Sequence, residues 1–263
     1  MNENRENSFF NPSELKGIVS YLIINFLLGS FVLIFLAIGI SIFNKNYTFI
    51  ELFELSAVSI ENIGTLSEDK QYIYYNLNTY TNLICYLLGF IVVCFFMRNH
   101  LVNDFKEIKE KPIYFTVLAI ISAILFYGIS ILVSYGIDKL VGVSNNQSLI
   151  EGMILNGGTV PIFFAVVVFA PMVEELIYRK AIFKLLDKKH IALSYVVSTI
   201  VFVLPHMLST PINNFGDWLL LCVPYFISAI LLCLVYHLSK KNVYASWFVH
   251  MINNLVTFIL ILV

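Results

Sequence analysis

Charged residues are scarce in this chain. Asp, Glu, Lys and Arg make up 13% of its 263 residues, hydrophobic residues make up 59%, and the mean hydropathy is +0.83. Soluble domains carry about 25% charged residues, so this composition excludes an ordinary soluble fold and predicts a membrane protein. The formal net charge of −1 gives no electrostatic basis for binding nucleic acid.

Cysteine is scarce too, and several catalytic motifs are missing. Four cysteines lie within apolar runs: Cys85, Cys94, Cys222 and Cys233. In such runs cysteine usually acts as a small hydrophobic residue, so we expect no disulfide. The sequence contains no glycine-rich phosphate loop and no H-E-x-x-H zinc motif. It also lacks a serine in a glycine-rich turn with a partner histidine, which disfavours a serine nucleophile.

Long apolar runs fill most of the sequence. A membrane-spanning helix needs about 20 apolar residues, and about seven segments meet that requirement. They are residues 17–43, 77–97, 113–137, 159–183, 191–210, 217–238 and 243–263. The sequence therefore predicts an all-α fold, a polytopic helical membrane bundle of about seven transmembrane helices.

Lys and Arg are unevenly divided between the two sides of this bundle. With the N-terminus in the cytoplasm, all of the 16 Lys and Arg residues fall on the inner side except three on the outer side: Lys45, Lys70 and Lys139. Because cytoplasmic connections carry the excess of Lys and Arg, we predict a cytoplasmic N-terminus and an outer C-terminus. The Lys- and Asn-rich connections favour a bacterial plasma membrane as the location of this multi-pass protein.

One continuous membrane domain is the simplest division of the chain. It comprises a cytoplasmic tail (1–16), N-terminal transmembrane helices (17–137) and a catalytic core (150–263), with no linker or repeat between them. The outer connection, about 44–76, is acidic and amphipathic. That pattern predicts a short helix lying on the membrane surface.

Ionisable side chains lie at four places within the spans. Three are the motifs "EELIYR" at 174–179, "FVLPH" at 202–206 and "HMINN" at 250–254, and the fourth is "VYH" ending at His237, which we interpret as a structural residue of the inner face. A charged group inside a bilayer is costly and usually functional. Glu175 and Arg179 are four residues apart, which predicts an ion pair on one helix face. Glu174, about 100° round the helix, is then free to face a cavity.

We expect Glu174, His206, His250 and Asn254 to meet in one small polar chamber. There a carboxylate can act as a general base on a water that a histidine positions. A second histidine and an amide can donate hydrogen bonds to an oxyanion, worth about 2.7–4 kcal/mol each. Glu174, His206 and His250 are also possible ligands for a divalent metal such as zinc. Asn is a poor zinc ligand, which favours the metal-free version, but both versions stay open.

Depth in the membrane restricts this chamber. Glu174 and His206 reach the same level only if the fourth span stays embedded to about Leu186 and the fifth starts nearer to Tyr195. His250 lies about 11 Å from the inner end of its span at 1.5 Å per residue. That count favours a chamber on the cytoplasmic side.

The three motifs, in this order, resemble those of the CAAX-protease and bacteriocin-processing (CPBP, or Abi) intramembrane proteases. The resemblance implies a glutamate-dependent endopeptidase of a class long described as metalloproteases. In it, Glu174 activates water with His206, while His250 and Asn254 stabilise the oxyanion. Glu175, Arg179 and Phe202 would orient these groups. The implied substrate is a membrane-associated peptide or protein cut near the cytoplasmic face, in peptide-pheromone or bacteriocin processing or immunity.

Two other functions fit the same motifs. A non-catalytic membrane scaffold or immunity protein would keep them for helix packing. A transporter would use a buried Glu/His relay, but it is expected to have broken helices or paired repeats, which the sequence does not show. The partners we expect are membrane lipid and a peptide or membrane-protein substrate, and no nucleic acid.

Overall fold

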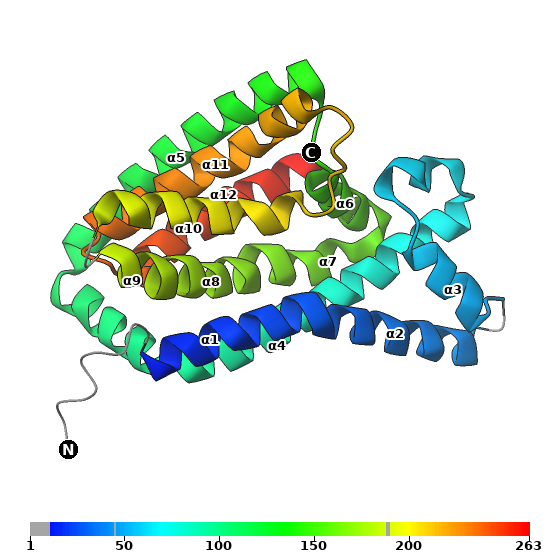
Figure 1. Ribbon diagram of the computed structural model, residues 1–263, viewed down its shortest axis with the longest axis horizontal. Helices are drawn as coiled ribbons and strands as arrows, with labels where there is room; N and C mark the ends of the chain where they lie inside the picture. The colour runs from blue at the N-terminus through cyan, green and yellow to red at the C-terminus, as the bar shows by residue number, and fades with distance from the viewer. Residues whose placement is uncertain (1–10, 45, 188–189) are drawn as a thin grey trace.

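The computed structural model describes residues 11–44, 46–187 and 190–263, and within these ranges it contains helices and no strand. Figure 1 shows the long helices lying side by side in one bundle. We call the end with α9 the inner end and the end with α3 and α6 the outer end, according to the orientation that the Lys and Arg residues predict.

The N-terminal half supplies three long helices. The first consists of α1 (Pro12–Ile23), a π-helical turn (Ile24–Leu28) and α2 (Gly29–Phe43). At the outer end follow α3 (Phe49–Ser56) and a 3-10 turn (Ile60–Thr65). The bundle continues with α4 (Glu68–Glu110) and α5 (Pro112–Val141). A short helix is thus present in the outer connection, and its first turn is capped by Thr48 and Glu51 in a reciprocal capping box.

The C-terminal half carries the motifs. Its first long helix runs from Asn145 to Asp187 through α6 (Asn145–Met153), α7 (Thr159–Ile162), α8 (Ala170–Glu174) and α9 (Lys184–Asp187). The π-helical segments between them are η4 (Ile154–Gly158), η5 (Phe163–Phe169) and η6 (Glu175–Phe183). The last three helices are α10 (Ile191–Met207), α11 (Phe215–Leu238) and α12 (Val243–Leu262).

Six helices in the described ranges are long and apolar enough to cross a membrane. They are Pro12–Phe43, Glu68–Glu110, Pro112–Val141, Asn145–Asp187, Phe215–Leu238 and Val243–Leu262. The predicted span at 191–210 is the shorter apolar helix α10, which ends at Met207. These lengths confirm a polytopic helical membrane bundle.

The long helix Asn145–Asp187 changes direction near its outer end. Gly157 has a φ of +92°, a conformation that glycine adopts without steric cost. The next residue, Gly158, packs so closely on α4 that an added Cβ would lie 2.6 Å from Thr79 Oγ1. Beyond this kink the helix continues through Glu174 and past Arg179 to Asp187. Glu174 and His206 require such an extension to lie at the same depth.

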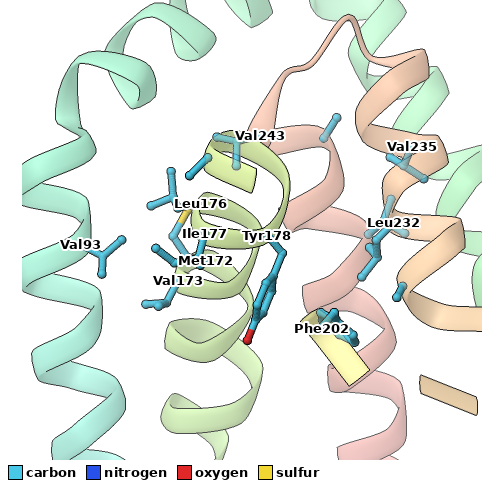
Figure 2. Packing of buried hydrophobic residues seen from close by; sticks show 14 of the residues in the cluster. Val93, Met172, Val173, Leu176, Ile177, Tyr178, Phe202, Leu232, Val235 and Val243 are labelled. Atoms are coloured by element: carbon cyan, nitrogen blue, oxygen red, sulfur yellow. The ribbon is translucent and has the colours of Figure 1, made fainter. Parts of the chain in front are cut away.

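The segment α8–η6 lies at the centre of the bundle. Figure 2 shows Met172, Val173, Leu176, Ile177 and Tyr178 in one cluster with Val93 of α4, Phe202 of α10 and Leu232 of α11. Burial on every side explains why even the charged residues of η6 are hidden from solvent. π-Helical turns are rare and occur frequently at functional sites, and here one begins directly after Glu174.

A buried ion pair fixes the inner turn between α11 and α12. Lys180 Nζ lies 2.6 Å from Asp104 Oδ1, and both side chains are almost fully buried. Asp104 Oδ2 also accepts a hydrogen bond from the backbone N–H of Val243 at 2.8 Å, so α4 caps the start of α12. This contact holds the first residue of α12 at the level of Lys180, which brings His250 level with Glu174 and Glu175.

Candidate active site

Glu175 and Arg179 form the buried ion pair that their spacing predicts. Arg179 Nη1 lies 3.2 Å from Glu175 Oε1, and neither side chain has any exposed surface. Arg179 Nη2 also donates to the carbonyl oxygen of Ala229 at 3.3 Å. The carboxylate has a further partner that the spacing does not predict, because Glu175 Oε1 lies 3.1 Å from His250 Nδ1.

His250 stands between the two adjacent carboxylates. An ionised carboxylate only accepts hydrogen bonds, so the contact with Glu175 assigns a proton to Nδ1 and turns Nε2 toward Glu174. The distance from His250 Nε2 to Glu174 Oε2 is 3.8 Å, longer than a direct hydrogen bond. Glu175 therefore fixes the ring orientation of His250 relative to Glu174.

Glu174 differs from its neighbour in what surrounds it. The residue is only 5% exposed, yet in the part of the chain that the structure describes no hydrogen bond to its side chain is found, and His250 Nε2 lies 3.8 Å from Oε2. Glu174 lines a cavity of about 680 Å³. The sequence predicts that Glu175 is held in an ion pair and that Glu174 faces a cavity, and the structure places them in this way.

His206 is held at the outer end of α10 by two rings and a backbone carbonyl. Its Nδ1 lies 2.9 Å from the carbonyl oxygen of Phe202, which assigns a proton to Nδ1 and leaves Nε2 as an acceptor. The imidazole stacks on Phe202 with ring centroids 4.8 Å apart. Tyr225 of α11 covers it at the same centroid distance.

Phe202 joins the three motifs. Besides stacking on His206, its ring centroid lies 4.6 Å from the guanidinium carbon of Arg179 and 5.9 Å from the centroid of His250. An aromatic ring attracts a cation placed over its face. Phe202 therefore contacts one residue from each motif, and its orienting role stays a prediction.

Asn254 is the fourth predicted residue. One N–H of its amide donates to the carbonyl oxygen of Val166 in η5 at 2.8 Å. An amide nitrogen carries two donors, so a second N–H remains. Glu174, His206, His250 and Asn254 all line the same cavity, whereas Glu175 and Arg179 lie in the packed layer beside it.

The lining of this cavity gives its direction along the bundle. Counting residues along α12 favoured a chamber on the cytoplasmic side, and Glu174 and His250 do lie in the inner halves of their helices. From these residues the lining runs along α5 and α12 to their outer ends, as Phe126 to Asp138 and His250 to Ile261 show. The depth of the chamber in the membrane stays a prediction.

Two tyrosines were missed as site residues. Tyr225 packs against His206 with the two rings tilted by 37°, and its hydroxyl lies 2.7 Å from Ser144 Oγ. Tyr21 of α1 lines the cavity, and its hydroxyl lies 2.5 Å from that of Tyr178. Tyrosine is common in this sequence, with 15 copies, so no local pattern distinguishes Tyr21 and Tyr225 from tyrosines that only pack.

Across residues 11–44, 46–187 and 190–263, no group of three or more His, Cys, Asp or Glu side chains is placed to hold a metal ion. His250 Nδ1 contacts Glu175 and His206 Nδ1 contacts a carbonyl oxygen, so each ring keeps Nε2 for a further ligand. Glu174, His206 and His250 are the residues that would hold a divalent ion, which would activate water or polarise a carbonyl there. The reaction proposed below uses side chains of this chain alone.

Fold and site together define a class of protein. It is a polytopic helical membrane protein with a carboxylate, two imidazoles and an amide around an internal cavity. Residues 156–256 match the family model of the type II CAAX prenyl endopeptidase Rce1-like proteins. This match agrees with the family that the three motifs indicate.

One curated relative is a protein of Mycoplasma capricolum subsp. capricolum, described as an uncharacterized protein. It is 30% identical over 183 residues, which cover 65% of this chain and 52% of the relative. The chain therefore spans about half the length of that relative. No solved structure matches the chain.

Proposed function

We propose that this protein is an intramembrane endopeptidase that hydrolyses a peptide bond of a membrane-associated peptide or protein. The observation that carries the proposal is the placement of Glu174, His206, His250 and Asn254 around one cavity. The family match over residues 156–256 supports the same class of activity. Peptide-pheromone or bacteriocin processing would be the physiological setting.

The first half of the reaction uses Glu174 and His206. A water in the cavity donates one hydrogen bond to the carboxylate of Glu174 and one to Nε2 of His206, the free acceptor of that ring. Glu174 takes the proton as the water oxygen attacks the scissile carbonyl carbon. The product of this step is a tetrahedral intermediate with a negative oxygen.

The second half uses His250 and Asn254. In the imidazolium form both nitrogens of His250 are donors, so Nε2 stabilises the oxyanion while Nδ1 stays on Glu175. The free N–H of Asn254 is the second donor. Glu174 then returns its proton to the leaving nitrogen, the C–N bond breaks, and the carboxylate is restored.

A comparison of cellular peptides tests this proposal and identifies the substrate in the same experiment. A strain carrying Glu174→Gln is compared with the wild type and with a strain carrying Glu54→Gln, a matched change on the exposed outer helix α3. We expect uncut precursors to accumulate only in the Glu174→Gln strain. A scaffold or immunity protein without catalytic activity would give three identical peptide profiles and a phenotype that survives the substitution.

A further inference from the structure

The cavity around Glu174 occupies one part of the bundle only. Its lining runs along α5 from Phe126 to Asp138, along α11 from Leu221 to Ser228, and along α12 from His250 to Ile261. Each of these stretches lies between about the middle of its helix and the outer end. The site thus continues toward the outer connections and not toward the inner ones.

Packing fills the inner part of these helices. Phe183 contacts Tyr236 edge-on with ring centroids 5.7 Å apart, and Ser198 Oγ donates to the carbonyl oxygen of Tyr178 at 2.9 Å. Further in, the ion pair of Lys180 with Asp104 joins η6 to α4. A peptide approaching from the inner end would have to break these buried contacts to reach Glu174.

The outer connection lies close to the catalytic groups. The ring of Tyr225 packs against His206, and its hydroxyl contacts Ser144. Asn145 at the start of α6 donates its backbone N–H to Thr210 Oγ1 at 3.2 Å, beyond the end of α10. Tyr225 therefore links His206 to Ser144, a buried residue of the outer connection.

The outer part of the cavity is acidic. Asp138 and Glu151 line it, and no Lys or Arg is among the described residues that do. Glu151 accepts a hydrogen bond from Gln147 at 2.8 Å, but neither carboxylate forms a salt bridge within the described ranges. Deeper in the cavity Glu174 adds a third, almost buried carboxylate without a hydrogen bond.

We propose that the cavity admits its substrate from the outer side of the membrane and that this substrate is a peptide segment carrying positive charge. Asp138 and Glu151 would hold its basic residues by electrostatic complementarity, and its backbone would extend inward past Tyr225 to Glu174. This inference rests on the proposed peptidase activity for its chemistry, but its two parts are testable by labelling and binding, without cleavage.

Labelling with a membrane-impermeant maleimide tests the direction of access. Single cysteines are placed in a background with the four native cysteines changed to Ala: Val143→Cys at the outer connection, Ser228→Cys deep in the cavity and Lys240→Cys at the inner turn. Reagent added to intact cells should label the first two and leave the third unlabelled until the cells are lysed. Labelling of the inner cysteine alone, or protection of the deep one, would overturn outward access.

Binding of a fluorescent peptide tests the charge preference. The Glu174→Gln protein is reconstituted in nanodiscs and titrated with a decapeptide containing three Lys and with its counterpart containing three Glu. We expect the basic peptide to bind about tenfold more tightly, with a preference that weakens as salt is added. Asp138→Asn with Glu151→Gln should abolish the preference, whereas Glu54→Gln with Glu61→Gln, an equal charge change outside the cavity, should keep it.

The outcomes separate the two proposals. Equal binding of both peptides, or a preference that survives Asp138→Asn with Glu151→Gln, contradicts the role of these carboxylates whatever the protein catalyses. If labelling and binding follow the expectation while no precursor accumulates in the Glu174→Gln strain, the access route stands and the peptidase assignment fails.

Discussion

At the scale of single residues, the two adjacent glutamates, Glu174 and Glu175, have different surroundings. Glu175 sits fully buried against Arg179 and His250, whereas Glu174 lines the cavity with its Oε2 3.8 Å from His250 Nε2. Neighbouring carboxylates on one helix thus separate into a positioning group and a reactive group, because the packed layer surrounds one of them and the cavity the other.

Exchange of each glutamate for glutamine separates these roles. Glu175→Gln leaves Arg179 buried without its counter-charge, a loss of about 3–5 kcal/mol for a buried pair, so we expect a lower unfolding temperature in detergent. Glu174→Gln removes no hydrogen bond, and the protein should unfold near the wild-type temperature while activity is lost. A stable Glu175→Gln protein beside an unstable Glu174→Gln protein would reverse the assignment.

Tyr225 is predicted to position His206 without taking part in the chemistry. Tyr225→Phe keeps the ring that packs against the imidazole and loses the hydroxyl contacts with Ser144 and Asn146, so cleavage should slow by a few-fold at most. Tyr225→Leu removes the ring contact, and kcat should fall by about tenfold or more, since small misplacements of a catalytic group are costly. Equal effects of both substitutions on kcat would show that the ring does not position His206.

At the scale of the helices, close contacts set the position of the motif-bearing helix. Its outer part packs on α4 through glycine, and its inner part is joined to α4 through Asp104 and Lys180. Both contacts connect segments that lie far apart in the sequence.

Gly158 tests the outer contact. An added Cβ would lie 2.6 Å from Thr79 Oγ1 and 2.5 Å from the carbonyl oxygen of Met153, and such overpacking typically costs about 1–3 kcal/mol. Gly158→Ala should therefore lower the unfolding temperature. Gly128→Ala on α5, where no atom lies within 4 Å of the added Cβ, serves as the control. Equal unfolding temperatures for the two variants would contradict the close approach.

The buried pair tests the inner contact. Asp104→Asn leaves Lys180 without its counter-charge and should destabilise the protein by about 3–5 kcal/mol. The double variant Asp104→Asn with Lys180→Met should recover much of that loss, as a double-mutant cycle measured by chemical unfolding can show. Additive losses would mean that the two side chains do not interact.

At the scale of the whole molecule, the sequence predicts the helical spans, and the four residues that it singles out line one cavity. Helix length and apolar content are local properties, and residues four apart on one helix share a face. The contact of Glu175 with His250 and the ion pair of Asp104 with Lys180 join helices far apart in the sequence. They depend on how each helix is rotated and how deep each turn lies, which no local pattern records.

The direction of the cavity shows the same limit. The residue count places His250 in the inner half of the last helix, and α12 begins at Val243 as predicted. From His250 the lining extends toward the outer connections. That direction depends on how the helices pack against one another, which no count along a single helix records.

The central claim is that Glu174 activates the water that attacks the peptide bond. Its most direct test is the initial rate of cleavage by purified protein in nanodiscs, measured on a precursor that accumulates in the Glu174→Gln strain. We predict that Glu174→Gln lowers kcat by about 10³-fold or more, within the range of a lost general base and its electrostatic contribution, while Glu54→Gln leaves it unchanged. A Glu174→Gln protein that cleaves at the wild-type rate would contradict the account.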